Sequence, residues 1–266
     1  MMTIQKYVRA QSLEEAYELN QKKSNRIIGG MLWLKMTSLN VGTAIDLCEL
    51  GLDTIEETED AFSIGAMVSL RQLELHEGLN SYTQGAVAKA VQDIVGVQFR
   101  NLATIGGSIY GRFGFSDVLT VFLAMDTYVE LYKGGIVSLE EYASRKPDRD
   151  ILVRILVKKH PGTFTYLSMR NTRTDFPVLT CAVSCLDKEY RAVIGARPGR
   201  AVLLRDTQDI LSDGITEHTA AAFADFAAEH TVVGSNLRGS AKYRTHLTRV
   251  LMNRALLELE GMTHGN

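Results

Sequence analysis

Residues 98–117, QFRNLATIGGSIYGRFGFSD, form a glycine-rich stretch that is the most informative part of the sequence. We expect its backbone to turn at positive φ or to lie closely against another group, because glycine allows both. Main-chain N–H groups in such a turn can point at an anion without any lysine. Thr104 and Ser108 flank the paired glycines and would add hydroxyl donors. Four glycines fall within nine positions of this stretch: Gly106, Gly107, Gly111 and Gly114.

Asp117 ends this stretch and precedes an apolar run, residues 118–125, which is typical of a buried helix. The carboxylate at that boundary has two interpretations. It could cap the helix, or it could accept hydrogen bonds from the hydroxyl groups of a ligand. The residues alone leave both interpretations open.

A second pair of adjacent glycines lies upstream, in residues 26–36, RIIGGMLWLKM. It follows a short β-branched run and precedes an apolar helical pattern. A glycine-rich connection between buried elements would explain one such turn. Two strand–Gly-Gly–helix turns in one chain suggest that two ends of one diphosphate are held from two sides.

The composition is that of an ordinary globular protein, with 266 residues that favour two domains. The formal net charge is −2 and no basic block is present, which argues against nucleic acid and acidic membrane surfaces as partners. No apolar stretch resembles a signal peptide or is long enough to span a bilayer. The sequence therefore predicts a cytoplasmic protein that does not enter a membrane.

Strand and helix patterns follow one another along the whole chain, which predicts an α+β fold. Residues 12–15, SLEE, form a capping box that begins a helix, one helix is predicted around residues 81–95, and residues 133–135, KGG, close a hairpin. In the last helix one apolar stripe is formed by Leu247, Val250, Leu251 and Ala255.

After residues 160–162, HPG, the predicted strands follow one another in direct succession. We therefore place a domain boundary there, between domains 1–160 and 161–266. Three strands are predicted after the boundary, and two helices, over about 217–229 and 239–260, close the chain. The three strands lie near residues 163–170, 177–186 and 190–197.

Metal binding has little support in the sequence, and no Gly-x-Ser-x-Gly turn that would present a nucleophilic serine is present. Cys48, Cys181 and Cys185 are the only cysteines, so the chain cannot supply four thiolates for an iron–sulfur cluster. The last two lie four apart in a predicted strand, which favours small thiols on one buried face. The six histidines are scattered without ligand spacing, so no metal site is predicted.

Considered together, these motifs resemble the FAD subunit of the molybdenum hydroxylases, the family of xanthine dehydrogenase and aerobic carbon monoxide dehydrogenase. The resemblance is carried by Gly29-Gly30, by residues 100–108 (RNLATIGGS) with Asp117, and by residues 240–244 (SAKYR) before the last helix. It implies a two-lobed FAD-binding domain of the vanillyl-alcohol-oxidase type. A small α+β C-terminal domain, a three-stranded antiparallel sheet plus helices, would follow.

The resemblance also implies the residues that bind the cofactor. In the family the two Gly-Gly turns hold the FAD diphosphate through main-chain amides, and the aspartate at the position of Asp117 contacts the ribityl chain or nearby hydroxyls. Met31 and Leu32 stand where the family usually has a threonine and a polar residue, so side-chain donors are lost there. Arg112 would either offset the diphosphate charge or be exposed. The predicted FAD-binding set is Ile28, Gly29, Gly30, Met31, Leu32, Trp33, Thr104, Ile105, Gly106, Gly107, Ser108 and Asp117.

Three functions remain open at this point. The first is an electron-transfer subunit with non-covalent FAD, which partners a molybdopterin-containing large subunit and a [2Fe-2S] small subunit. Electrons would reach FAD from the iron–sulfur partner and leave to NAD or another acceptor, and no catalytic residue is required from this chain. The second is a free-standing flavin-dependent oxidoreductase. The third is a family member that has lost flavin and acts as a structural or binding module.

Overall fold

The computed structural model describes residues 1–264 and forms two units that interleave along the sequence. The first unit comprises Met1–Leu73, Val97–Gly111 and Thr127–Lys158. The second unit comprises Glu74–Gly96, Arg112–Asp126 and the chain from Lys159 onward. The predicted domains 1–160 and 161–266 divide the chain at a single point, and that division stays a prediction.

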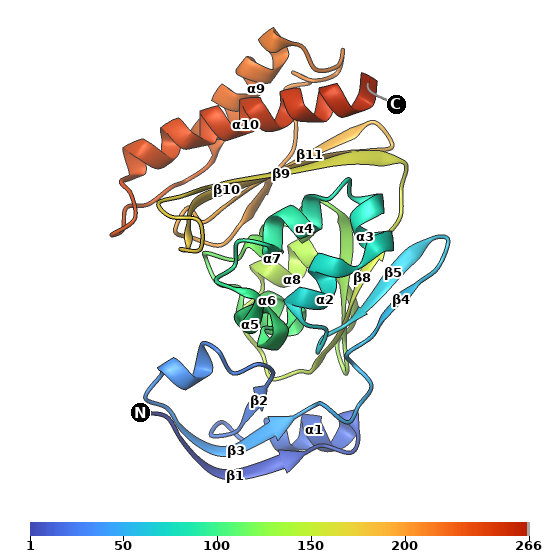
Figure 1. Cartoon of the computed structure of the whole chain (residues 1–266), viewed down its shortest axis with the longest axis vertical. Coiled ribbons are helices and arrows are strands. Elements are labelled where there is room, and N and C mark those ends of the chain that lie inside the picture. The colour runs from blue at the N-terminus through green and yellow to red at the C-terminus, as the bar shows by residue number, and fades with distance from the viewer. Residues whose placement is uncertain (265–266) are drawn as a thin grey trace. The chain divides into compact units, whose positions relative to one another are not determined.

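The smaller sheet of the first unit has three parallel strands in the order β1-β3-β2 (Figure 1). Ser12 caps the helix that follows β1, because its hydroxyl accepts the N–H of Glu15 at 3.1 Å. The Glu15 carboxylate accepts the N–H of Gln11 at 2.8 Å, one residue before the partner that a regular capping box would use. The elements are β1 (Thr3–Arg9), α1 (Leu13–Asn20), β2 (Arg26–Ile28), the 3₁₀ helix η1 (Leu34–Met36) and β3 (Asn40–Asp46).

The larger sheet of the first unit has five strands in the order β4-β5-β8-β6-β7. The predicted hairpin that turns at Lys133-Gly134 is present, with Val129 opposite Val137 in an antiparallel pair. The strands are β4 (Ile55–Glu57), β5 (Ala61–Gly65), β6 (Asp126–Leu131), β7 (Gly135–Ser138) and β8 (Leu152–Lys158). The helices are α2 (Leu70–Leu75), α5 (Val97–Leu102), α6 (Ile105–Gly111) and α8 (Leu139–Ser144).

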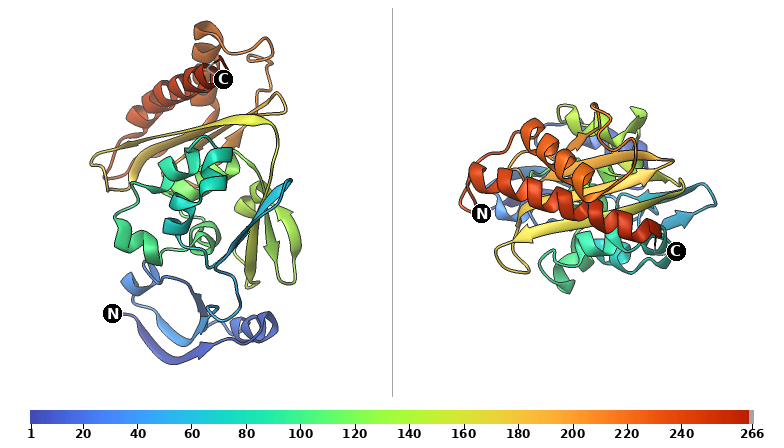
Figure 2. Two further views of the ribbon diagram at one scale, coloured as in Figure 1. Left: turned by 45° about the vertical axis from the view of Figure 1, so that its right-hand side comes forward. Right: turned by 90° about the horizontal axis from the view of Figure 1, so that it is seen from above.

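The second unit is an antiparallel sheet with helices on both faces. Figures 1 and 2 show α9 and α10 over one face, and α4 and α7 contact the sheet through β9, β10 and β11. The strands are β9 (Gly162–Arg170), β10 (Pro177–Leu186), β11 (Glu189–Gly195) and β12 (Val202–Leu204). The helices are α3 (Glu77–Tyr82), α4 (Ala86–Val91), α7 (Asp117–Leu123), α9 (Glu217–His230) and α10 (Ala241–His264).

Two expectations about this unit are wrong in detail. The sheet has four strands, in the order β12-β11-β10-β9, and not three. The strand that the sequence did not reveal is only three residues long, Val202–Leu204, too short to show an alternating pattern. The single helix expected over residues 81–95 is two helices, because Gly85 adopts φ +80° between them.

The core between the sheet and the last two helices forms as the helical periodicity predicts. Leu247, Leu251 and Ala255 lie on one stripe of α10 and are all buried. Cys181 is buried in the same core and Cys185 packs against it, so both cysteines share one face of β10. Burial of a large apolar side chain contributes about 1.5 to 3 kcal/mol each. The helices are therefore held to the sheet by this apolar contact.

Candidate functional site

The first glycine pair connects β2 to the 3₁₀ helix η1 in the first unit. Neither Gly29 nor Gly30 has a positive φ; the left-handed residue of the turn is Met31, at φ +57°. The two glycines therefore do not serve a positive φ at this turn. They serve close approach, since a Cβ on Gly30 would lie 1.9 Å from the carbonyl oxygen of Leu102.

The main chain of this turn offers a row of open donors. None of the N–H groups of Gly29, Gly30, Met31 and Leu32 has a hydrogen-bond acceptor within residues 1–264. Gly29 is exposed and the next three residues are half-buried. Successive N–H groups around a left-handed residue form a concavity that binds anions. The turn is therefore able to hold a phosphate oxygen without any side chain.

The second glycine pair begins a helix and does not form an open loop. Gly106, Gly107 and Gly111 all belong to α6, and none of them has a positive φ. The N–H groups of Ile105 and Gly106 donate to the carbonyl oxygens of Val68 and Ala66, both at 2.9 Å. These two amides are occupied inside the protein, contrary to the expectation of bare donors.

Thr104 is the side chain around which the second turn is organised. Its Oγ1 accepts the N–H of Gly107 at 3.1 Å, and its carbonyl oxygen accepts both the N–H and the hydroxyl of Ser108 at 3.1 Å. The hydroxyl proton of Thr104 has no acceptor in the described part of the chain. One hydroxyl donor therefore stays available at this turn.

The two glycine turns meet at Thr104. A Cβ on Gly29 would lie 2.8 Å from Thr104 Oγ1, and a Cβ on Gly107 would lie 3.2 Å from the same atom. The rings of Trp33 and Phe99, 5.7 Å apart, join the segments that flank the turns. The structure thus brings together two motifs that are far apart in the sequence, with open donors from the first turn and one hydroxyl from the second.

Asp117 belongs to the second unit, where it is the first residue of α7. The cap of this helix is Ser116, whose hydroxyl accepts the N–H of Leu119 at 3.0 Å. The interpretation of Asp117 as the helix cap is therefore wrong by one residue. Its carboxylate instead contacts Tyr166 and Arg170 of β9.

Arg112 is also in the second unit. It is 4% exposed and adopts φ +46°, so the interpretation that it is simply exposed is wrong. Among the described residues, no group of three or more His, Cys, Asp and Glu side chains could hold a metal ion.

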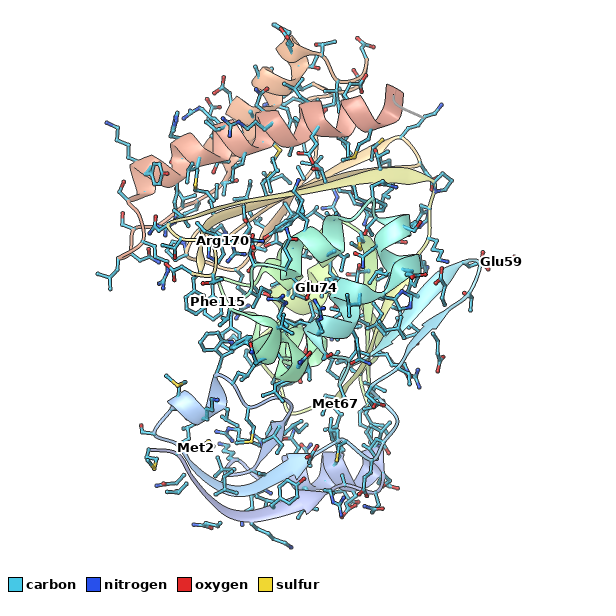
Figure 3. All side chains as sticks on the ribbon, in the orientation of Figure 1. Met2, Glu59, Met67, Glu74, Phe115 and Arg170 are labelled. Carbon is cyan, nitrogen blue, oxygen red and sulfur yellow. The ribbon has the colours of Figure 1, made fainter. Side chains whose placement is uncertain are left out.

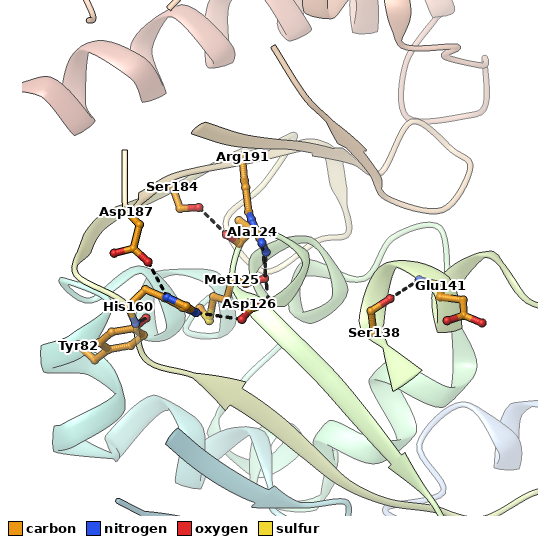
Figure 4. Close-up of polar contacts among 10 residues, drawn as sticks. All are labelled: Tyr82, Ala124, Met125, Asp126, Ser138, Glu141, His160, Ser184, Asp187 and Arg191. Carbon is orange, nitrogen blue, oxygen red and sulfur yellow. Dashed lines mark hydrogen bonds and ion pairs between the residues drawn. The ribbon is translucent and has the colours of Figure 1, made fainter. Parts of the chain in front are cut away.

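His160 is part of a polar cluster in the second unit that sequence reasoning missed (Figure 4). Its ring nitrogens lie 2.7 Å from Asp187 and 2.9 Å from Asp126, while Arg191 donates to the carbonyl oxygen of Met125 at 2.9 Å. The hydrogen bonds to Asp126 first, and to Asp187, raise the pKa of His160 above its ordinary value against the opposing effect of burial. Nothing in the local sequence indicates these partners, because they lie 34 and 27 residues away.

Replacing His160 by glutamine is expected to lower stability below about pH 6.5 and to matter less as the pH rises. The protonated ring donates to both carboxylates, and a raised folded-state pKa means that this contribution is lost as the pH rises through that pKa. The effect should be at most about 1 kcal/mol, because Asp187 is exposed. Thermal unfolding of the wild-type protein and of His160→Gln, from below pH 6.5 to above the folded-state pKa of His160, measures the effect. A stability difference between the two proteins that grows with pH would contradict the prediction.

Two family models cover nearly the whole chain. The FAD binding domain in molybdopterin dehydrogenase matches residues 2–159, and the CO dehydrogenase flavoprotein C-terminal domain matches residues 164–259. None of the helices within residues 1–264 is both long and apolar enough to span a bilayer.

Full-length relatives and solved structures agree with these models. The nicotine 6-hydroxylase medium subunit of Paenarthrobacter nicotinovorans is 24% identical, and the match covers 97% of this chain and 98% of that protein. The uncharacterized protein YgfM of Escherichia coli K12 is 28% identical over 94% of each chain. The reconstituted CO dehydrogenase from Oligotropha carboxidovorans superposes with a TM-score of 0.88 at 20% identity, over 97% of this chain and 98% of that chain.

Proposed function

Because this chain belongs to the family of FAD-binding subunits of molybdenum hydroxylases, we propose that it is the electron-transfer flavoprotein subunit of such an enzyme. Relatives named as a nicotine 6-hydroxylase medium subunit and a xanthine dehydrogenase FAD-binding subunit support this role. Its partners under this proposal are a molybdopterin-containing large subunit and a [2Fe-2S] small subunit in the cytoplasm.

The observation that carries the proposal is the row of open N–H groups from Gly29 to Leu32 beside Thr104 and Gly107. These residues fit a dinucleotide diphosphate, because main-chain donors replace the polar side chains that Met31 and Leu32 lack. Gly30 lets the turn approach the segment before Thr104, where no side chain has room. Ile28 and Trp33 flank the donors, while Ile105, Gly106 and Ser108 hold the second turn in place.

FAD bound here would supply the redox chemistry, accepting electrons from the iron–sulfur partner and passing them to NAD or another acceptor. The chain itself binds the cofactor, orients it and provides no catalytic base. A two-lobed FAD-binding domain of the vanillyl-alcohol-oxidase type, followed by a C-terminal domain from residue 161, is the architecture that we propose for this role.

FAD is expected to bind non-covalently. A covalent link needs a histidine, cysteine or tyrosine beside the ring, and neither glycine turn contains a histidine or a cysteine. Acid precipitation of the holoprotein should therefore release the flavin into the supernatant, where absorbance measures it. Flavin that stays with the pellet would contradict the expectation.

The isolated chain is expected to transfer electrons and not to hydroxylate. Loaded with FAD, it should pass electrons from a reduced nicotinamide to an artificial dye, yet leave purines and related heterocycles unchanged. Addition of the molybdenum and iron–sulfur subunits from the same host should produce hydroxylation. Dye reduction and product formation are both followed by absorbance.

Two outcomes would replace the proposal with a different function. Turnover of an organic substrate by the isolated chain at a typical enzyme rate of about 10 s⁻¹ would indicate a free-standing flavoenzyme. Apo-protein that folds but binds no FAD would indicate a member of the family that has lost the cofactor.

A further inference from the structure

The loop between α9 and α10, residues 231–240, is held in one conformation by hydrogen bonds (Figure 1). Asn236 and Gly239 exchange two main-chain hydrogen bonds, at 3.1 and 3.2 Å, and close a hairpin with Leu237 and Arg238 at its tip. The side chain of Asn236 supports the tip, because its Oδ1 accepts the N–H of Arg238 at 3.0 Å. We refer to residues 231–240 as the α9–α10 loop.

Arg244, in the first turn of α10, fixes the base of the α9–α10 loop. Its Nη1 donates to the carbonyl oxygen of Gly234 at 2.8 Å and to that of Gly239. Its Nη2 donates to Asn236 Oδ1 at 2.7 Å. The conformation of the loop is therefore defined by polar contacts to its main chain and to Asn236.

The apolar side chains of this loop face solvent. Leu237, at the tip, is fully exposed, and Val232 is 80% exposed although its carbonyl oxygen is held by Arg197 at 2.6 Å. Tyr243, which is 41% exposed, extends this surface onto α10. Scattered exposed apolar residues are ordinary. Apolar side chains on a fixed support, however, lose little conformational freedom when a partner covers them, so the loop is preorganised for binding.

Arg238 connects the tip of the loop to an aromatic pair in the same unit. Its guanidinium lies 4.7 Å from the centre of the Phe176 ring and donates to Asp175 Oδ1 at 2.9 Å. The Phe176 ring in turn meets the ring of Phe115, labelled in Figure 3, edge to face at 4.4 Å. Aromatic and arginine side chains are enriched at the centre of protein–protein interfaces. The composition of this surface therefore suits a protein partner.

The charge beside the loop is positive. Residues 231–257 contain no aspartate or glutamate and five basic residues, Arg238, Lys242, Arg244, Arg249 and Arg254. Arg244 is buried and Arg249 pairs with Asp225, whereas Lys242 is exposed directly after the loop. Like charges repel across an interface, so this surface disfavours a second copy of itself and favours an acidic partner.

We propose that the α9–α10 loop, with Lys242 and Tyr243, is the surface through which this chain docks onto an acidic face of a partner subunit. Leu237 fills an apolar pocket of that subunit, and Lys242 lies against carboxylates at the rim of the pocket. The inference rests on the proposed function and adds the surface by which the flavoprotein subunit joins its complex.

The experiment measures the Kd between the FAD-loaded chain and a purified complex of the molybdopterin-containing and [2Fe-2S] subunits from the same host, by biolayer interferometry. Leu237→Asp should raise this Kd at least about thirtyfold, because it removes the anchor and places a carboxylate against acidic groups. Lys242→Glu should raise it about tenfold at low salt, mainly through slower association, and less at about 0.5 M salt, where charges are screened.

Two variants of the same chemistry elsewhere on the chain are the matched controls. Leu75, at the end of α2, is 60% exposed, and Lys22 is exposed after α1. Leu75→Asp and Lys22→Glu should keep the wild-type Kd for the partner complex. All four variants should keep the wild-type melting temperature and FAD affinity, because each changes only an exposed side chain.

The outcomes separate this proposal from the proposed function. If the wild-type chain joins the complex and Leu237→Asp and Lys242→Glu bind it as tightly as their controls do, the docking surface is overturned and the proposed function stands. A loss with Leu237→Asp alone overturns the acidic character of the partner. A wild-type chain that does not join the complex overturns both proposals.

Discussion

Gly107→Val is expected to abolish FAD binding while the protein stays folded. Gly107 is exposed, and the closest atom that its Cβ would meet is Thr104 Oγ1 at 3.2 Å, so a side chain there requires the Thr104 hydroxyl to move by only a few tenths of an ångström. The added methyl groups would occupy the space beside the open donors of Gly29 to Leu32. We expect the Kd for FAD to rise at least about a hundredfold, about 2.7 kcal/mol, measured by titration of apo-protein.

Gly106→Ala is the control that separates binding from folding. Its Cβ would lie 2.4 Å from the carbonyl oxygen of Ala66, so the backbone must shift and stability should fall by about 1 to 3 kcal/mol or more. Gly107→Val should instead keep the melting temperature of wild-type apo-protein. Wild-type FAD affinity in Gly107→Val would remove the second glycine turn from the proposed site.

Arg244→Met is expected to cause the largest loss of stability, about 3 to 5 kcal/mol. Arg244 is fully buried at the start of α10 and donates to the carbonyl oxygens of Val178 and Gly234, at 2.9 and 2.8 Å. It also donates to Asn236 Oδ1 at 2.7 Å. Methionine fills much of the volume but leaves these acceptors buried without donors. Denaturant unfolding of the two proteins measures the difference.

Arg249→Met is the matched control on the same helix. The Arg249 guanidinium pairs with Asp225 at 2.6 Å, but both side chains are exposed, so its removal should cost less than about 1 kcal/mol. Equal losses for the two variants would show that the contacts of Arg244 are not what stabilises the second unit.

The sequence by itself determined the features that depend on near neighbours in the chain. The capping residue Ser12, the hairpin at Lys133-Gly134 and the apolar stripe through Leu251 all follow from spacing within a few residues. Paired glycines also showed where the backbone approaches another segment. These features were predictable because turn geometry and side-chain periodicity are local properties. The short strand β12 was not predicted, for the same reason, because three residues are too few to show an alternating pattern.

Only the tertiary structure decided which contacts the paired glycines and the carboxylate of Asp117 make. Gly30 and Gly106 are required by packing against backbone, whereas a Cβ on Gly107 would meet only the side chain of Thr104 among the described residues. Asp117 finds its donors, Tyr166 and Arg170, 49 and 53 residues away in the sequence. A hydrogen bond forms where two groups meet in space, and the meeting of α7 with β9 is set by the packing of a whole unit and not by the residues beside Asp117.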